Sequence, residues 1–334
     1  MKTLNIFRFL LILLGACNFV SAQDSLSLYQ NLKSQYDSER DFKQYIFYNP
    51  ANMLDYSSFS SSELFIDYFN QKDKVYRQQN GSEKQGFGVK TNSYQKLNTN
   101  KALWGSASYQ NLKTKHIKFN ENLDFDRVAP YFSSDSIGGD LEIEKYQFLG
   151  GYTQRFNKIT VGAEASYNAQ LGSRAKDPRI NNITSELNLK IGLNYAFYKK
   201  FELGIFAEGE RYLQNSRIRF ASKLGQPLVY QMTGLGFYNN LFSGGTSSIT
   251  TIHEEFGYKV GGQINHDKGK DFYVMAQMGQ SSMLKNYQGT GNTYYDLSEL
   301  DNDYFEVEAA KFFNINAQRV GFKVNYLSNQ TTGK

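Results

Sequence analysis

FLGGYTQRFNKITVGAEASYNAQL, residues 148–171, is the stretch of sequence that decides the fold class. From Ile159 onward, apolar and polar side chains alternate one by one, as in Val161 against Thr160 and Glu164. A period of two places the two sets on opposite faces of a β-strand. A strand of a soluble sandwich usually has about five or six residues, whereas this one has the length of a tilted strand that crosses an outer membrane. The pattern therefore favours an antiparallel, up-and-down transmembrane β-barrel.

The residues before this strand predict its hairpin partner, because Asn157-Lys158 reads as a two-residue turn. Counting outward from the turn gives a complete register. It pairs Arg155 with Thr160, Thr153 with Gly162, Gly151 with Glu164 and Lys145 with Gln170 on the polar face, and Tyr152 with Ala163, Phe148 with Tyr167 and Tyr146 with Ala169 on the apolar face.

Composition agrees with a barrel. The 334 residues contain no linker-like division, so one large domain is expected. A mean hydropathy of −0.55 excludes a helical membrane bundle, while strands with alternating polarity escape that test. Aromatic residues make up 16% of the chain, which suits the two aromatic girdles of a membrane barrel.

Residues 1–22 read as a secretory signal peptide, with Lys2 and Arg8 before an apolar run and Val20-Ser21-Ala22 as the cleavage site. Cleavage here predicts export to the outer membrane. The only cysteine, Cys17, lies within this segment and leaves open the alternative of lipoprotein processing. Removal of Lys2 and Arg8 lowers the formal net charge from +5 to 5 − 2 = +3, which is too mild to indicate nucleic-acid binding.

Residues 23–58 are expected to form a short leader, whose helical part ends before Pro50. We expect it to pack beneath the barrel on the periplasmic side; the alternative is a plug inside the lumen. Residues 59–334 form the barrel, with about 12–14 strands. The predicted strands are 60–70, 86–96, 101–113, 142–156, 159–171, 183–197, 201–213, 216–224, 227–240, 251–265, 271–284, 303–313 and 316–327.

Long and short connections alternate along the first half of the chain, as they do in outer-membrane barrels. Thirteen strands would leave the last one ending on the external side, and the polar tail Thr331-Thr332-Gly333-Lys334 lacks a terminal aromatic residue. Bacterial barrels generally have an even number of strands. The expectation is that this chain stops before its barrel closes.

In several short sequence motifs, the chain resembles an uncharacterised family of Bacteroidota outer-membrane β-barrel proteins. The motifs are Tyr48-Asn49-Pro50-Ala51, Asn120-Glu121-Asn122 with Pro130-Tyr131 and Gly138-Gly139, Gly150-Gly151-Tyr152, Asp177-Pro178-Arg179 followed by Asn182-Ile183-Thr184, and Gly234-Leu235-Gly236. The barrels of gliding and type IX secretion, and hydrophobic-compound channels, also look similar. The resemblance implies an outer-membrane location and supplies no catalytic residues.

Chemistry-bearing motifs are scarce, so no enzyme and no cofactor is expected; an outer-membrane enzyme is a weaker alternative. We expect His116 and His266 to lie near loops, and His253 to be a solvated rim residue. An acidic run in and after a loop at 285–302 offers weak calcium candidates, Asp301, Asp303 and Glu306. A basic loop is a candidate to contact lipid phosphates through Lys72, Lys74, Arg77 and Lys84.

The polar sets of the predicted strands supply the lumen-facing candidates, Lys145, Arg155, Glu164, Glu186, Lys190, Glu208, Glu210, Glu255 and Lys259. A turn at Tyr198-Lys199-Lys200 predicts Lys190 opposite Glu208, or opposite Glu210 if the turn is longer. The mixture of signs argues against strong ion selectivity. The function that we expect is a pore or uptake accessory for small solutes, alternatively an occluded docking or secretion-associated barrel, with outer-membrane lipid, lipopolysaccharide and other outer-membrane proteins as partners.

Overall fold

The computed structural model describes residues 42–222, 228–244, 248–289, 293–316 and 318–334. Its contacts divide the chain into two units, Met1–Ser38 and Glu39–Lys334. The first unit lies outside the described residues, and so do the predicted signal peptide (1–22), Cys17 and the start of the leader (23–58).

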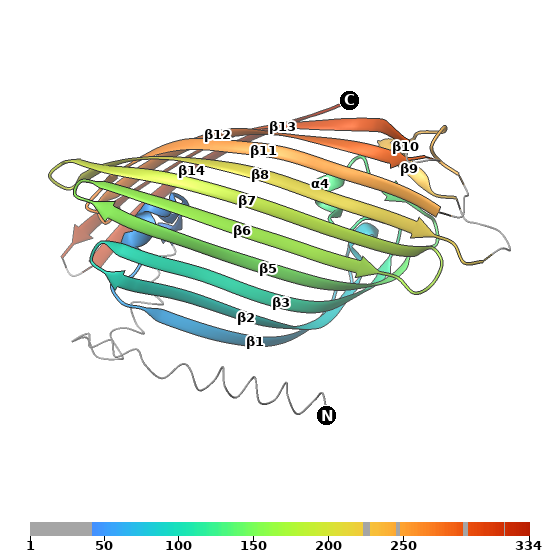
Figure 1. Cartoon of the computed structure of the whole chain (residues 1–334), viewed down its shortest axis with the longest axis horizontal. Coiled ribbons are helices and arrows are strands. Elements are labelled where there is room, and N and C mark those ends of the chain that lie inside the picture. The colour runs from blue at the N-terminus through green and yellow to red at the C-terminus, as the bar shows by residue number, and fades with distance from the viewer. Residues whose placement is uncertain (1–41, 223–227, 245–247, 290–292, 317) are drawn as a thin grey trace. The chain divides into compact units, whose positions relative to one another are not determined.

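The second unit is nearly all antiparallel β-structure, as the alternation predicts, with fourteen strands in the described residues. Eleven form one sheet in which neighbours follow chain order, and β10, β9 and β4 form a small second sheet (Figure 1). The strands are β1 (Ser61–Lys72), β2 (Glu83–Asn98), β3 (Lys101–Ile117), β4 (Ser133–Ser134), β5 (Gly139–Phe156), β6 (Ile159–Ser173), β7 (Arg179–Tyr198), β8 (Phe201–Arg219), β9 (Tyr230–Gly234), β10 (Phe237–Tyr238), β11 (Ser248–His266), β12 (Phe272–Gln288), β13 (Tyr294–Ile315) and β14 (Gln318–Gly333).

Helix is confined to short pieces, which are η1 (Gln44–Tyr48), η2 (Pro50–Asp55), η3 (Gln78–Asn80) and α4 (Phe125–Val128). Within the described ranges, no helix has the length and apolar character needed to cross a membrane. The large sheet ends at β1 on one edge and β14 on the other. That the chain stops before a barrel closes remains a prediction.

The predicted hairpin register is confirmed. All seven pairs named for β5 and β6 are Cα partners in the structure. Asn157 supports the two-residue turn with φ of 56°, a left-handed conformation that asparagine tolerates better than most residues. Lys190 lies opposite Glu208 as predicted, although by a different route: the turn has two residues, Lys199 and Lys200, and an irregularity between Ala196 and Tyr198 restores the register.

Two strand predictions and one loop prediction are wrong. The strand predicted at 201–213 lies within β8, but 216–224 is no separate strand in the described residues, because β8 and its alternation of buried and exposed residues continue to Arg219. The described part of 227–240, which is 228–240, holds only the short β9 and β10, outside the main sheet. The predicted loop at 285–302 is mostly strand, since β12 runs to Gln288 and β13 begins at Tyr294.

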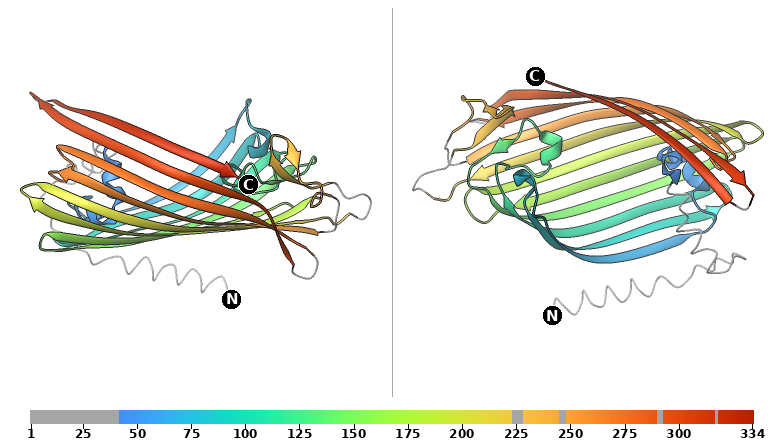
Figure 2. Two further views of the ribbon diagram at one scale, coloured as in Figure 1. Left: turned by 90° about the horizontal axis from the view of Figure 1, so that it is seen from above. Right: turned by 180° about the vertical axis from the view of Figure 1, so that it is seen from behind.

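These corrections restore the alternation in part: 73–82, 118–138 and 220–247 are long, whereas 174–178 and 289–293 have five residues, as many as the β11–β12 turn at 267–271. Short turns join β2 to β3, β5 to β6, β7 to β8, β11 to β12 and β13 to β14, whereas the connections 73–82, 118–138, 174–178, 220–247 and 289–293 lie at the opposite ends of the strands. We call the connection 118–138 the inner loop and residues 42–58 the N-terminal segment. Figure 2 shows η1, η2 and α4 on the same side of the large sheet, which we call its inner face.

The outer face carries an apolar band that crosses the strands diagonally. At one side the band reaches Leu171 of β6, which pairs with Ile183 of β7. On β14, at the other side, the band reaches only Tyr326. The strand registers, followed from β14 through β13, β12, β11 and β8, place Tyr326 level with Leu193 of β7. At the short-turn end the band finishes in aromatic rings, with Phe201 6.0 Å from both Phe197 and Phe272.

Candidate functional site

All nine lumen-facing candidates lie on the inner face, and the structure gathers most of them into two clusters. We call Arg127, Glu186, Glu210 and Glu255 the arginine cluster, and Lys190, Glu164, Glu208 and Lys259 the lysine cluster. The remaining two, Lys145 and Arg155, lie outside these clusters, at a cavity and at the N-terminal segment respectively.

The arginine cluster joins the inner loop to three strands. Arg127 lies in α4 and pairs with one carboxylate on each of β7, β8 and β11: Glu186 at 3.3 Å from Nη1, Glu255 at 2.7 Å from Nε, and Glu210 through Nη2. Its guanidinium carbon lies 4.0 Å from the centroid of the Tyr212 ring. The planar guanidinium therefore contacts an aromatic face while its edges donate to three acceptors, an arrangement that a lysine ammonium does not reproduce.

Electrostatics keep Arg127 charged in this position. Burial lowers the pKa of Arg127, but Glu255 and Glu210 outweigh burial and raise its pKa above the ordinary value. The cluster carries three carboxylates for one guanidinium, so removing Arg127 would leave three like charges close together.

Further contacts fix the inner loop on either side of Arg127. The Asp124 carboxylate accepts hydrogen bonds from the Tyr212 hydroxyl (2.8 Å) and from Gln170 Nε2 (3.0 Å). Nearer the loop end of the sheet, Glu121 pairs with Arg174 at 3.0 Å, and both side chains are almost fully buried. Burial raises the pKa of Glu121, against the opposing effect of Arg174.

The lysine cluster lies closer to the short turns. Lys190 Nζ is 3.3 Å from Glu164 and 3.9 Å from Glu208, and Lys259 is 4.0 Å from Glu208. Tyr48 of η1 donates to Glu208, and its ring lies 3.9 Å from Lys190 Nζ. These pairs link neighbouring strands and attach the N-terminal segment to them.

The N-terminal segment lies against glycines of the inner face. A Cβ at Gly162 would overlap the Pro50 carbonyl group, a Cβ at Gly192 would overlap the Asn49 amide, and one at Gly204 would be 2.8 Å from Asn49 Nδ2. We call these three residues the glycine surface. The backbone of η2 can therefore approach β6, β7 and β8 only because these positions lack side chains.

Hydrogen bonds fix the segment on this surface. Asn49 is fully buried; its side-chain oxygen accepts from Ala51 N at 2.9 Å, and its Nδ2 donates to the carbonyls of Leu193 and Ile205 at 3.4 Å. The described part of the predicted leader thus occupies the inner face, which is the arrangement of the plug alternative.

One end of the segment is also held by charge. Asp55 pairs with Arg155 at 2.8 Å and with Lys268 of the β11–β12 turn at 2.7 Å. Burial raises the pKa of Asp55, but hydrogen bonds and attraction from Lys268 and Arg155 leave it below the ordinary value.

Three polar cavities lie along the inner face between the inserted segments. One of about 540 Å³ lies between Tyr48 and Tyr304, and one of about 420 Å³ extends from Tyr304 to Arg127. A third, of about 410 Å³, includes Lys145 and lies on the other side of Arg127. The first two share Lys259 and Tyr304, and the last two share Asp126 and Arg127.

The calcium prediction is wrong. Asp301 and Asp303 lie on the outer face of β13, where they contact Lys334 and Gln280, whereas Glu306 points inward to Tyr304 and Gln277. An odd and an even position on one strand face opposite ways, so these oxygens do not converge. In the part of the chain that the structure describes, no three His, Cys, Asp or Glu side chains are grouped as metal ligands.

The prediction for His253 is also wrong. His253 is fully buried, with Nε2 2.9 Å from the carbonyl oxygen of Tyr131 in the inner loop, and is no solvated rim residue. In the basic loop, Arg77 pairs with Asp126 of the inner loop at 2.7 Å and Lys84 lines the 410 Å³ inner cavity. Lys72 and Lys74 are exposed, and contact of this loop with lipid stays a prediction. His116 and His266 do lie at strand ends, where they contact Ser82 and Asp271.

Sequence reasoning missed Arg127 and Tyr48, which come from outside the strands. A signal for Arg127 was present in the register, because Glu186 and Glu255 both pair with Tyr212 on the inner face and Glu210 is two residues along β8. Three carboxylates so placed, with no inner lysine among them, require a cation from another part of the chain.

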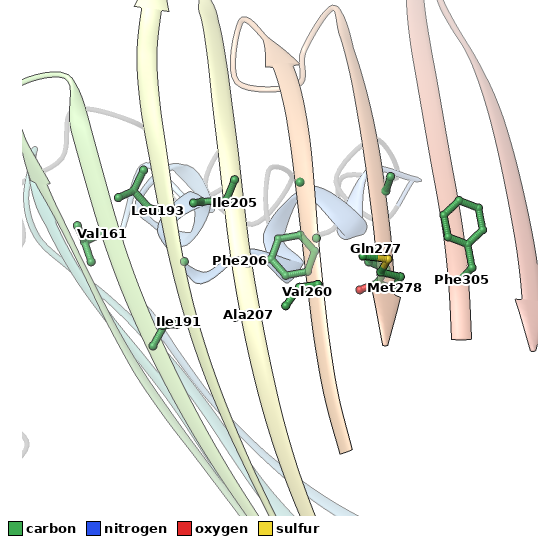
Figure 3. Close-up of a pocket in the computed structure, with 14 residues that line it drawn as sticks. Val161, Ile191, Leu193, Ile205, Phe206, Ala207, Val260, Gln277, Met278 and Phe305 are labelled. Atoms are coloured by element: carbon green, nitrogen blue, oxygen red, sulfur yellow. The ribbon is translucent and has the colours of Figure 1, made fainter. Parts of the chain in front are cut away.

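The outer face has an apolar groove of about 840 Å³ that extends from β6 to β13 across β7, β8, β11 and β12 (Figure 3). Small residues, Ala207, Gly262 and Ala276, occupy its middle, and larger ones such as Ile191 and Phe305 flank it. The groove is a depression in the apolar band, and none of the outward-facing residues that line it is polar.

Comparison with known proteins adds a family and no function. No curated protein matches the sequence. Among solved structures, the ferric-catecholate import receptor Fiu of E. coli K12 in its open form is 8% identical, with a TM-score of 0.43 over 81% of this chain and 50% of that one. The ferric yersiniabactin uptake receptor FyuA of Yersinia pestis is 9% identical, with a TM-score of 0.40 over 82% and 47%.

The ferric citrate transporter FecA without ligand is 10% identical, with a TM-score of 0.37 over 76% of this chain and 39% of that one. The chain thus spans half or less of the length of these three proteins. A family model matches residues 50–334, which is most of the sequence and all of the large sheet. By this match the chain belongs to a family of unknown function, DUF6850.

Proposed function

We propose that this protein is an outer-membrane β-barrel protein in which two inserted segments close the solute path, and that it serves as an uptake accessory or gated pore for small solutes. Its activity is physical, with no catalytic step. The apolar band, the aromatic rings at its short-turn end and the long connections at the other end support a membrane location, with the long connections external.

The arginine cluster is the observation that carries the proposal. Arg127 holds α4 against β7, β8 and β11, and its side chain separates two polar cavities. A solute moving along the inner face from one of these cavities to the other has to displace this contact. The cluster therefore acts as a constriction at the external side of the lumen.

The N-terminal segment supplies the second constriction, at the periplasmic side. Close packing on the glycine surface leaves no room between η2 and strands β6 to β8. Between the two constrictions lie the cavities that share Lys259 and Tyr304. Their mixture of ammonium, carboxylate and phenol groups favours small polar solutes of no strong charge preference.

The test is conductance in a planar bilayer. The wild-type protein should show few or no stepwise openings. Arg127→Ala should increase the open probability at least tenfold, because three unpaired carboxylates repel one another and release the inner loop. The matched control is Arg211→Ala, which removes an arginine of β8 and its pair with Glu254 (2.7 Å) on the outer face.

Large, constant conductance of the wild-type protein would overturn the closed state. Equal conductance of wild type and Arg127→Ala would overturn the role of the cluster. Failure of the wild-type protein to insert into the bilayer would overturn the membrane location itself.

A second function, that of a docking platform, is favoured by the order at the long-connection end. There β4 of the inner loop pairs with β9 from the β8–β11 connection, and β9 pairs with β10. Such a small sheet is a defined surface for another outer-membrane protein. Stable capture of an outer-membrane partner by wild type, lost when residues 228–244 are deleted, together with an absence of conductance from every variant, would favour docking.

A further inference from the structure

Three arginines lie together on the outer face near the long connections. Arg179 of β7 and Arg219 of β8 are Cα partners, and Arg217 is two residues from Arg219 on the same face. All three are exposed, whereas Ile180 and Ile218 between them are buried in an apolar cluster on the inner side. We call Arg179, Arg217 and Arg219 the arginine patch.

Positive charge in the patch is only partly balanced by the protein. Arg179 Nε lies 3.1 Å from Asp177, whose other oxygen accepts hydrogen bonds from the backbone of Ala221 and Ser222. Within the described ranges, Arg217 and Arg219 have no carboxylate at ion-pair distance.

The strand neighbours of these two arginines do not supply an anion either. Arg217 pairs with Asn181 and Thr250, and Arg219 pairs with Arg179 and Ser248. Like charges directly across a β-ladder are destabilising, so the patch favours an external anion.

The position of the patch along the strands, relative to the apolar band, identifies the class of anion. The row below it, Ile183 with Asn215 and Ile252, still carries apolar side chains, whereas the row of Arg217 is entirely polar from Ser173 to Thr250. Consecutive outward residues on a strand are about 7 Å apart. On β7 and β11 the patch therefore begins about 7 Å along the strand beyond the last apolar row, at the level of lipid headgroups.

We propose that the arginine patch binds the phosphate groups of a phosphorylated glycolipid in the outer leaflet. This inference rests on the outer-membrane location proposed above. Guanidinium groups match phosphate oxygens through paired hydrogen bonds, and three of them on one surface supply the charge that the glycolipid neutralises. A lipid is favoured over an acidic protein because Ile183 of β7 and Ile252 of β11, one outward row below the patch, continue it toward the apolar band, where acyl chains would lie.

The experiment uses the full chain, purified in detergent, with diphosphoryl lipid A as the probe and native mass spectrometry to measure the Kd. The double variant Arg217→Gln/Arg219→Gln should bind about 25-fold more weakly, since each basic group near a membrane surface contributes about a fivefold change in affinity. Arg217→Lys/Arg219→Lys should stay within about threefold of wild type, because it keeps both charges.

The matched control is Lys158→Gln/Lys199→Gln, which removes two exposed positive charges at the short-turn end. It should leave the Kd unchanged. Inorganic phosphate, added as a competitor, distinguishes a lipid site from a site for free phosphate. The two single variants, Arg217→Gln and Arg219→Gln, repeat the test if the double variant does not fold.

Equal affinity of the wild-type protein and the Gln variants would overturn the patch as a glycolipid site. Displacement of lipid A by an equimolar amount of inorganic phosphate would overturn the choice of a lipid. Insertion into phosphatidylcholine vesicles is measured separately. If the protein inserts but does not bind lipid A, this inference fails and the proposed membrane location stands; if the protein does not insert, the proposed location fails first.

Discussion

The inner loop and the N-terminal segment both occupy the inner face, yet they are held there by different physics. Arg127 attaches the loop through three ion pairs, while the N-terminal segment packs its backbone against glycines at positions where a single Cβ would overlap it. An ion-pair cluster responds to salt and to protonation, whereas close packing responds to volume. The two constrictions should therefore open under different conditions.

The largest effect should come from Arg127→Ala. Breaking a largely buried ion pair by removing one partner typically costs about 3–5 kcal/mol, and here three carboxylates lose their only shared cation. Denaturant unfolding in detergent measures the change. The control, Arg211→Ala, removes an exposed pair on the outer face of β8 and should cost no more than about 1 kcal/mol. Similar losses for the two variants would mean that charge does not hold the loop.

A smaller effect is expected when a methyl group is added beneath the N-terminal segment. Gly162→Ala places a Cβ into the backbone of Pro50 and Ala51 and should cost about 1–3 kcal/mol by overpacking. The matched controls are Gly150→Ala and Gly209→Ala, where an added Cβ meets no heavy atom within 4 Å. Trypsin cleavage after Lys43 should accelerate in Gly162→Ala alone. Unchanged cleavage in that variant would contradict close packing as the cause of attachment.

Salt should separate the two segments without any substitution. Raising ionic strength from about 0.1 M to 1 M shortens the Debye length from about 10 Å to about 3 Å. Hydrogen exchange should then become a few-fold faster in α4, while the amides of Ala51 and Asn52, held by Asn49, should not change. Parallel acceleration in both segments would remove the distinction drawn between them.

The smallest effect concerns the charged end of the N-terminal segment. The pKa of Asp55 is lower in the folded protein than in the unfolded chain, so its pairs contribute stability above pH about 4, the usual aspartate value, and lose it as pH falls further. Lys268 is 46% exposed, which limits the contribution to about 1 kcal/mol. The difference in stability between wild type and Asp55→Asn should shrink below pH 4; a constant difference would show that the charge of Asp55 is irrelevant.

Much of the arrangement of strands in the large sheet was predictable from sequence, because local rules determine it. The Asn157-Lys158 turn determines every pair of β5 and β6, and strict alternation then assigns each side chain to a face. The same rule was not applied to Asp301, Asp303 and Glu306, because this run of acidic residues was predicted to lie in and after a loop. Their odd and even positions already assign them to opposite faces of a strand.

The contacts by which the inner loop and the N-terminal segment close the inner face were not predictable in this way. Arg127 and Tyr48 reach their partners over 59 to 160 residues of chain, and no local period records such contacts. His253 shows the same limit: its position on β11 follows from alternation, but its burial depends on Tyr131 of the inner loop. Long connections that fold back onto a sheet are determined by tertiary packing, and a strand pattern does not report them.

The diagonal course of the apolar band has a consequence for the bilayer. From β6 to β14 its upper limit shifts by ten residues (193 − 183) over six steps between neighbouring strands. With about 3.3 Å per residue and about 4.8 Å between strands, this corresponds to a strand tilt of about 50° from the membrane normal. Along β8, the ten residue-to-residue steps from Phe201 to Arg211 then span a hydrocarbon thickness of only about 21 Å. A protein of this height matches a thin membrane, and vesicles of short-chain lipids should accept it faster than those of ordinary thickness.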